Sequence, residues 1–139
     1  MKVFLAASFR IEEDQKFLER IRRLLEKEGN AVWCAKDHIG DYYGTEDRER
    51  LKEIIEIEKD EILKSDLVVV LLNKLVPGPI MQLFYAAEFE IPTILYLKNE
   101  NDGIRLSPWL RYHCKVVRTD RTFLIALSQV KKKVEKEFL

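Results

Sequence analysis

A glutamine and a glutamate occupy positions that helical spacing would otherwise assign to apolar side chains. Gln82 falls in the predicted first turn of an otherwise apolar helix. Glu58 is four residues from both Ile54 and Ile62 and shares their stripe. A buried carboxylate or amide is costly unless it is paired or lines a cavity, so both residues are candidates for chemistry. The alternatives are that Glu58 bends to the edge of the stripe and that Gln82 bonds the loop backbone within the core.

A hydroxyl and a guanidinium follow the first predicted strand. Ser8, Phe9 and Arg10 come directly after the apolar residues 2–7. In a parallel sheet this segment lies at the carboxyl end of the strand. A serine and an arginine beside helix N–H groups are typical of a phosphate site. The alternative is a capping serine with an exposed arginine.

The most apolar stretch of the chain joins a strand to the helix that carries Gln82. Residues 67–72 form an unbroken, β-branched run that predicts a strand buried on both faces. Residues 77–79, Pro-Gly-Pro, predict a tight loop, where Gly78 lets the backbone approach a ligand closely. A helix over 80–89 then begins. Such a strand–loop–helix junction lies at the carboxyl edge of a parallel sheet, where ligands bind.

Strands and helices alternate along the whole sequence. Strands are expected at 2–7, 31–34, 67–72, 91–97 and 114–118, and helices at about 12–28, 45–64, 80–89 and from 121 onward. We expect Thr45 to cap the second helix, residues 37–44 to be loop, and Ser107-Pro108 to open a short helical turn. The alternation predicts a single α/β domain over 1–139, flavodoxin-like or Rossmann-like, with helices on both faces and strand order 2-1-3-4-5.

Composition limits the class of partner. The 139 residues include 24 Lys plus Arg and 24 Asp plus Glu, so no basic excess indicates nucleic acid. The longest apolar run is far shorter than a membrane span, and no metal spacing or cofactor is predicted. Charged residues make up 35%, which is typical of thermophile surfaces. The chain opens directly with a strand-like segment, so a cytoplasmic location is expected.

Four segments together resemble the nucleoside 2-deoxyribosyltransferase superfamily. The sequence is most similar to the branch that hydrolyses deoxynucleoside 5′-monophosphates at the N-glycosidic bond. Residues 78–86 match the signature Gly-x-x-x-Glu-Leu-Gly-x-Ala, and the other matching segments are 3–10 with Glu13-Asp14-Gln15, 58–66, and Leu106-Ser107 with Arg111 and the last strand and helix. The resemblance covers nearly the whole chain.

The resemblance implies a nucleoside 5′-monophosphate as ligand. It assigns phosphate contacts to Ser8 and Arg10, and a further contact to Ser107 from the neighbouring subunit of a homodimer. Phe4, Phe9 and Gly78 fall in the matching segments and are candidate substrate-binding residues. Independently, the helix over 80–89 is apolar on nearly every face, which is typical of a buried or interface helix.

The matched catalytic positions depart from the family pattern. Gln82 stands where the family has a glutamate whose carboxylate attacks C1′ of the sugar. Glu58 matches an assisting aspartate, Phe4 replaces a tyrosine, and Phe84 replaces a glycine of the signature. An amide is neutral and a poor nucleophile. The resemblance therefore implies either an N-glycosidase or transferase, with Glu58 activating water, or a module that binds or senses a nucleotide without turnover. A third alternative is a TIR-like interaction domain, since such domains share the fold pattern.

Overall fold

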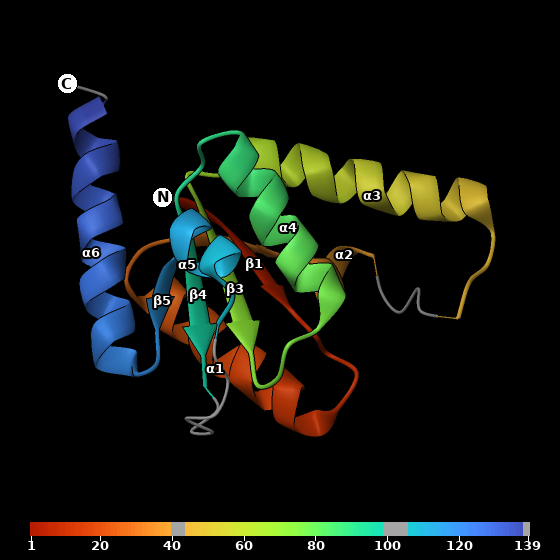
Figure 1. Cartoon of the computed structure of the whole chain (residues 1–139), viewed down its shortest axis with the longest axis horizontal. Coiled ribbons are helices and arrows are strands. Elements are labelled where there is room, and N and C mark those ends of the chain that lie inside the picture. The colour runs from red at the N-terminus through yellow and green to blue at the C-terminus, as the bar shows by residue number, and fades with distance from the viewer. Residues whose placement is uncertain (40–43, 99–105, 138–139) are drawn as a thin grey trace.

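The computed structural model describes residues 1–39, 44–98 and 106–137. Its centre is a five-stranded sheet of order β2-β1-β3-β4-β5 in which all neighbours pair in parallel (Figure 1). The strands are β1 (Lys2–Ala7), β2 (Ala31–Cys34), β3 (Leu67–Leu72), β4 (Thr93–Leu97) and β5 (Lys115–Val117). The α/β class and the strand order expected from the sequence are both confirmed.

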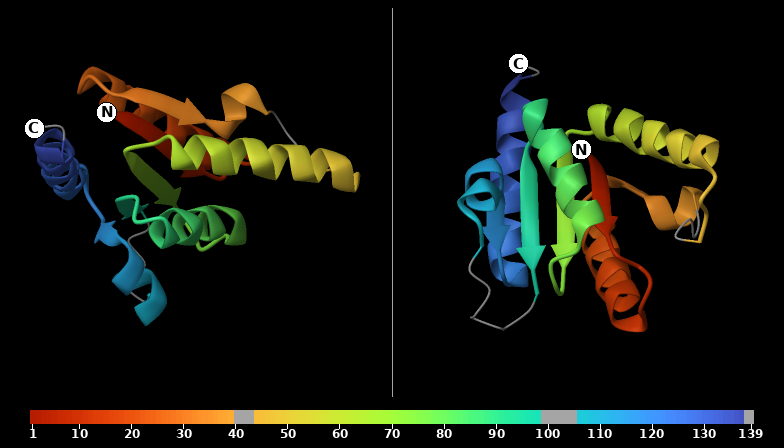
Figure 2. Two further views of the ribbon diagram at one scale, coloured as in Figure 1. Left: turned by 90° about the horizontal axis from the view of Figure 1, so that it is seen from above. Right: turned by 45° about the vertical axis from the view of Figure 1, so that its right-hand side comes forward.

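Six helices are described around the sheet in these ranges. They are α1 (Glu12–Lys27), α2 (Ala35–His38), α3 (Arg48–Leu63), α4 (Pro77–Glu88), α5 (Pro108–His113) and α6 (Asp120–Glu137). Figure 2 shows them on both faces of the sheet. Helices α1 and α6 cover one face, where Phe17 and Phe123 join the core. Helices α3 and α4 cover the other face, where Ile62 and Leu83 are buried.

The central strand explains why the helices lie on both faces. Every residue of β3 is buried, because β1 and β4 flank it and helices cover it above and below. Alternate side chains therefore point into two separate cores: Leu67 and Val69 face α1 and α6, whereas Val68 and Val70 face α3 and α4. The carboxyl ends of β1 and β3 meet at one edge, with Ala7 paired to Leu71.

Helix α4 begins three residues earlier than its apolar run predicts. Pro77 occupies the first helical turn, where its missing N–H leaves no hydrogen bond unmade, so the helix begins at the proline rather than at Ile80. Gln82 consequently lies in the second turn, and its expected first-turn position is wrong. The electrostatic field of the helix dipole falls off within the first turn, so it acts only weakly on Gln82.

The region between β2 and α3 also differs in detail. The cap of α3 is Asp47, whose carboxylate accepts from Glu49 N at 3.1 Å, and the expected cap Thr45 instead accepts from Asp47 N at 3.3 Å. The short helix α2 takes up the start of the segment expected to be loop, and residues 40–43 of that segment lie outside the described residues. On α3 the buried residues are Ile54, Glu58 and Ile62, whereas Ile55 is 45% exposed.

A polar contact joins three elements at the side of the sheet. The Tyr96 hydroxyl on β4 donates to Asp120 at the start of α6, and Arg20 on α1 donates to the other oxygen of the same carboxylate, both at 2.5 Å. In the described ranges, no helix combines the length and the apolar character needed to cross a membrane.

Candidate functional site

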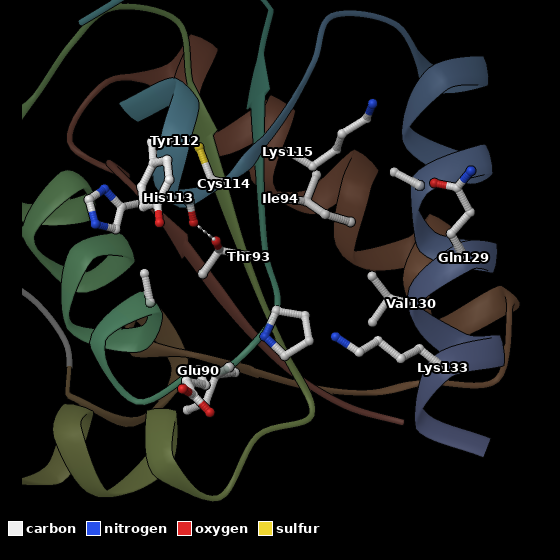
Figure 3. A pocket seen from close by; sticks show the side chains of 14 residues that line it. Glu90, Thr93, Ile94, Tyr112, His113, Cys114, Lys115, Gln129, Val130 and Lys133 are labelled. Atoms are coloured by element: carbon white, nitrogen blue, oxygen red, sulfur yellow. Dashed lines mark hydrogen bonds between the residues drawn. The ribbon is translucent and has the colours of Figure 1, made fainter. Parts of the chain in front are cut away.

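Two hollows differ in their place on the sheet. A groove of about 530 Å³ lies beside the amino ends of β4 and β5, between the end of α4 and helix α6 (Figure 3). Within it Thr93 Oγ1 donates to the His113 carbonyl at 2.7 Å. The second hollow is a cavity of about 30 Å³ at the carboxyl end of β1. Ligands of open parallel sheets bind at the carboxyl edge, so the smaller cavity is the stronger candidate for the site.

Four parts of the chain form the walls of this cavity, which we call the β1 cavity. They are β1 with Phe9, helix α1, the end of β2 with the start of α2, and the first half of α4. The lining residues are Phe4, Leu5, Ala6, Ala7, Phe9, Leu18, Cys34, Ala35, Lys36, Gly78, Pro79 and Gln82. Four positions singled out from the sequence, Phe4, Phe9, Gly78 and Gln82, therefore lie around one cavity. A volume of about 30 Å³ corresponds to roughly one water molecule. A larger ligand requires the side chains at the rim to move.

Gln82 and Glu58 lie against each other. Gln82 Nε2 donates to Glu58 Oε2 at 2.5 Å, and Glu58 is only 3% exposed. The sequence placed Glu58 on the apolar stripe of its helix, and the structure confirms that the carboxylate is buried rather than turned to solvent. Gln82 is half-buried and reaches the cavity from α4, with Glu58 behind it on α3.

The Ser8–Arg10 segment lies next to the same cavity. Phe9 lines it, whereas Ser8 is half-buried and Arg10 is exposed. Gln15 Nε2 on α1 donates to the Phe9 carbonyl at 2.8 Å, which fixes the loop to the first turn of the helix. The loop is thereby held in place between β1 and α1.

Acidic groups also stand at this edge of the sheet. The first turn of α1 carries Glu12, Glu13 and Asp14. Asp14 Oδ1 accepts from Asn73 Nδ2 at 2.6 Å, and Asn73 directly follows β3. This contact between the first turn of α1 and the residue that follows β3 was not foreseen, although a polar residue directly after a buried strand could have indicated it.

Ser107 lies elsewhere in the chain. It caps α5, its hydroxyl oxygen accepting from Trp109 N at 3.2 Å, as the sequence predicted. It is exposed and is not among the residues that line the β1 cavity. Its expected phosphate contact is to a neighbouring subunit, and this remains a prediction.

Helices α4 and α5 present an aromatic surface to solvent. The Phe84 ring contacts Trp109 and His113 with centroids 6.3 and 5.2 Å apart. We call this the α4–α5 surface, and its exposed members are Met81, Phe84, Phe89, Trp109 and Tyr112. Phe84, which replaces the signature glycine, faces this surface and is 41% exposed. It does not line the β1 cavity, so the replacement of the signature glycine by Phe84 does not narrow that cavity.

The wall after β2 was missed by sequence reasoning. Cys34 and Lys36 line the β1 cavity, and their position at or just after the carboxyl end of a predicted strand could have indicated them. Burial raises the pKa of the Cys34 thiol, with the nearby Arg22 guanidinium opposing that rise. Arg22 also pairs with Asp37 on α2, so the wall is fixed to α1.

Comparisons with solved structures identify the fold. No protein-family model matches the chain, and no curated protein sequence matches it. A 2-deoxyribosyltransferase of the psychrotolerant Bacillus psychrosaccharolyticus superposes with a TM-score of 0.73 at 15% identity, covering 86% of this chain and 87% of that chain. The chain shares its fold. The fold expected from the resemblance is thus confirmed.

Two further structures agree. A conserved protein from Enterococcus faecalis V583 gives a TM-score of 0.74 at 15% identity, covering 93% of this chain and 98% of that chain. The CMP N-glycosidase BcmB of Clostridium botulinum gives 0.63 at 18% identity, covering 92% of this chain and 99% of that chain. The similarity extends over nearly the full length in each case.

Proposed function

We propose that the chain binds a nucleoside 5′-monophosphate at the β1 cavity, in a site related to those that act on N-glycosidic bonds. The observation that carries the proposal is the contact between Gln82 and Glu58 at the wall of that cavity. These are the two positions that the family resemblance marks as catalytic. Two solved structures that share the fold are described as a 2-deoxyribosyltransferase and a CMP N-glycosidase.

The proposed ligand spans the carboxyl edge of the sheet. Its phosphate lies at the Ser8–Arg10 segment, where a hydroxyl and a guanidinium donate charge-assisted hydrogen bonds. Its sugar lies against Gln82, next to Gly78, where the backbone has no side chain in the way. Phe4 and Phe9 supply apolar walls, and the base occupies the rest of the cavity after the rim side chains have moved.

Turnover in this site depends on Glu58, because the amide of Gln82 cannot attack C1′. In hydrolysis the oxygen of a water molecule bonds to C1′, and the C1′–N bond breaks with its electron pair going to the base. The proton that water loses is finally taken up by the base. Glu58 is the group that would accept the proton of that water as general base. Gln82 would position the carboxylate and the water.

A second candidate is a module that binds or senses the nucleotide without cleaving it. The observation that favours it is the 2.5 Å hydrogen bond, which engages Glu58 Oε2 with the Gln82 amide and keeps that oxygen from a water. Both candidates share the nucleotide site. A TIR-like interaction domain, in contrast, would have no specific affinity for the nucleotide.

The α4–α5 surface supports a homodimer as part of the proposal. Ser107 lies at the start of α5, beside exposed Trp109, so a partner that covers this surface brings its own Ser107 near it. In this arrangement Ser107 completes the phosphate site of the neighbouring subunit.

Isothermal calorimetry tests the proposed function. The four common deoxynucleoside 5′-monophosphates are compared with the matching deoxynucleosides, and the nucleotides should bind more tightly. Replacing Arg10 in Arg10→Met should weaken nucleotide binding by about 1.5–3 kcal/mol, the usual value of a hydrogen bond to a charged group. Arg23→Met removes an exposed arginine of α1 as control and should leave binding unchanged. Equal affinity for nucleotide and nucleoside rules the phosphate site out.

A further inference from the structure

The wall of the β1 cavity that follows β2 carries a cation. Of the described residues that line this cavity, Lys36 alone bears a full charge. It comes from α2, whereas Gln82 comes from α4, and both border the same volume of about 30 Å³. A ligand that is bound against Gln82 therefore has Lys36 at another wall of the same cavity.

Among the residues that the structure describes, the ammonium of Lys36 has only a weak ion pair. Its ion pair with Glu19 Oε1 is 3.8 Å long, which exceeds hydrogen-bond distance. The same Glu19 oxygen lies 3.8 Å from Arg22 Nη1, so one carboxylate is shared by two cations. The side chain of Lys36 is 33% exposed and has a flexible stem with three donors. It can therefore turn to an acceptor inside the cavity without breaking a good hydrogen bond.

The base of a bound nucleotide offers such an acceptor beside the sugar. A pyrimidine carries the O2 carbonyl on the carbon next to its glycosidic nitrogen, whereas a purine has a ring nitrogen there and a second ring to place. Because it has a single ring, a pyrimidine requires less movement of the side chains at the rim of the cavity than a purine does. A carbonyl oxygen that accepts from an ammonium forms a charge-assisted hydrogen bond, which is stronger than a neutral one.

We propose that Lys36 is the base-recognition residue of this site and that it selects pyrimidine nucleoside 5′-monophosphates through the O2 carbonyl. The inference rests on the proposed function and deepens it by naming the class of base. The contact also has a consequence for hydrolysis. When the electron pair of the C1′–N1 bond moves into the ring, negative charge collects on O2, where the ammonium stabilises it until the base takes up the proton that water released.

Calorimetry with four ligands and three variants tests the assignment. The ligands are dUMP, dCMP, dAMP and 2-deoxyribose 5-phosphate, which has the same phosphate and sugar without a base. Native protein should bind dUMP and dCMP about tenfold or more tighter than dAMP. Lys36→Met should weaken dUMP binding by about tenfold to a hundredfold and leave 2-deoxyribose 5-phosphate unchanged. Lys36→Arg keeps the cation and should retain most of the affinity for dUMP.

Controls separate this inference from the proposed function. Lys132→Met removes an exposed charge on α6 and should change no affinity. If Lys36→Met weakens dUMP and 2-deoxyribose 5-phosphate equally, Lys36 serves the phosphate and the base assignment is wrong. If it weakens neither, or if dAMP binds as tightly as dUMP, the assignment is also wrong although the nucleotide site stands. If no nucleotide binds more tightly than its nucleoside, the proposed function fails and this inference falls with it.

Discussion

Gln82 on α4 donates a hydrogen bond of 2.5 Å to Glu58 on α3, 24 residues away in sequence, at the wall of a cavity on the carboxyl edge of the sheet. The carboxylate is 3% exposed, so the amide replaces water as its partner. A glutamate at position 82 would instead place two carboxylates in contact. Like charges this close cannot both ionise without a large cost.

The first prediction concerns turnover after restoring a carboxylate. Gln82→Glu should raise the release of free base from a deoxynucleotide by about a thousandfold or more, because a carboxylate can attack C1′ whereas an amide cannot. Nucleotide affinity should change little, since the two side chains are nearly isosteric. Free base is followed by chromatography for the native chain, Gln82→Glu and Glu58→Gln.

The outcomes of this experiment distinguish the hydrolase from the binding module. A Gln82→Glu variant that binds deoxynucleotides but releases no base leaves the binding module as the function. A native chain that already hydrolyses well makes Glu58 the general base, and Glu58→Gln should then abolish the release. In the active Gln82→Glu variant the two carboxyls share one proton, so the rate should depend on pH through the titration of the pair rather than of one residue.

Much of the fold follows from local pattern. The apolar run of β3 and the alternation of strands and helices specify a parallel sheet, since a strand buried on both faces requires helices above and below it. The boundaries are less well specified. The sequence predicts a loop at Pro77 although this residue begins α4, because proline is compatible with both a loop and the first helical turn. Asp47 rather than Thr45 caps α3, because both side chains can accept a hydrogen bond from the first N–H groups of a helix.

The site was only partly predictable. Glu58 could be found because a charge on an apolar stripe is conspicuous, and Gln82 because an amide interrupts an apolar helix. Their mutual contact depends on how α3 and α4 pack, which no local pattern encodes. Lys36 was missed for a different reason: a lysine after an edge strand resembles any exposed lysine until the cavity beside it is seen.

The second prediction measures the energy of the Gln82–Glu58 contact. A double-mutant cycle with Glu58→Leu, Gln82→Leu and the double variant, followed by urea unfolding, should give a coupling energy of about 1.5–3 kcal/mol. The reason is that each single change leaves a polar group without this partner in the interior, whereas the double change removes both. Effects of the two single changes that add to within about 0.5 kcal/mol would show that the contact contributes little in solution.

The third prediction concerns the link between stability and pH. The hydrogen bond from Arg20, supported by that from Tyr96, holds the pKa of Asp120 below its ordinary value. A lowered folded-state pKa means stability that is present above the pKa of the unfolded chain and is lost as pH falls through the folded pKa. Asp120→Asn should therefore lower the unfolding free energy at pH 7, and this loss should shrink as pH falls through the folded-state pKa of Asp120, because the native carboxylate is then protonated as well.

The size of that effect is limited by solvent. The Arg20 and Asp120 side chains are 44% and 49% exposed, so the loss at pH 7 should be no more than about 1 kcal/mol. Asp60→Asn removes an exposed pair with Lys64 and should change the unfolding free energy less than Asp120→Asn does. Urea unfolding of the native chain and both variants at a series of pH values from 7 downward provides the measurement. A loss for Asp120→Asn that does not change with pH would contradict the assignment.

The last prediction concerns the α4–α5 surface. Monomeric soluble proteins rarely expose large contiguous apolar patches, and Met81, Trp109 and Tyr112 are 70%, 69% and 86% exposed. Light scattering at micromolar concentration should therefore give the mass of a dimer. Phe84→Lys combined with Trp109→Lys should give a monomer, because each places a charge in the contact. Ser107→Ala should remain dimeric.

Nucleotide binding shows whether that dimer matters to the site. The oxygen of Ser107 caps its own helix by accepting from Trp109 N, and its hydrogen can still donate to a phosphate oxygen of a ligand in the partner subunit. Both the monomeric variant and Ser107→Ala should then bind the nucleotide about tenfold more weakly, because each loses one hydrogen bond to a charged group. The affinity of both variants for the nucleoside should be unchanged. Loss of affinity in the monomer but not in Ser107→Ala would mean that another residue of the partner completes the site. A monomeric native chain with undiminished nucleotide binding would show that each subunit holds the phosphate alone, through Ser8 and Arg10.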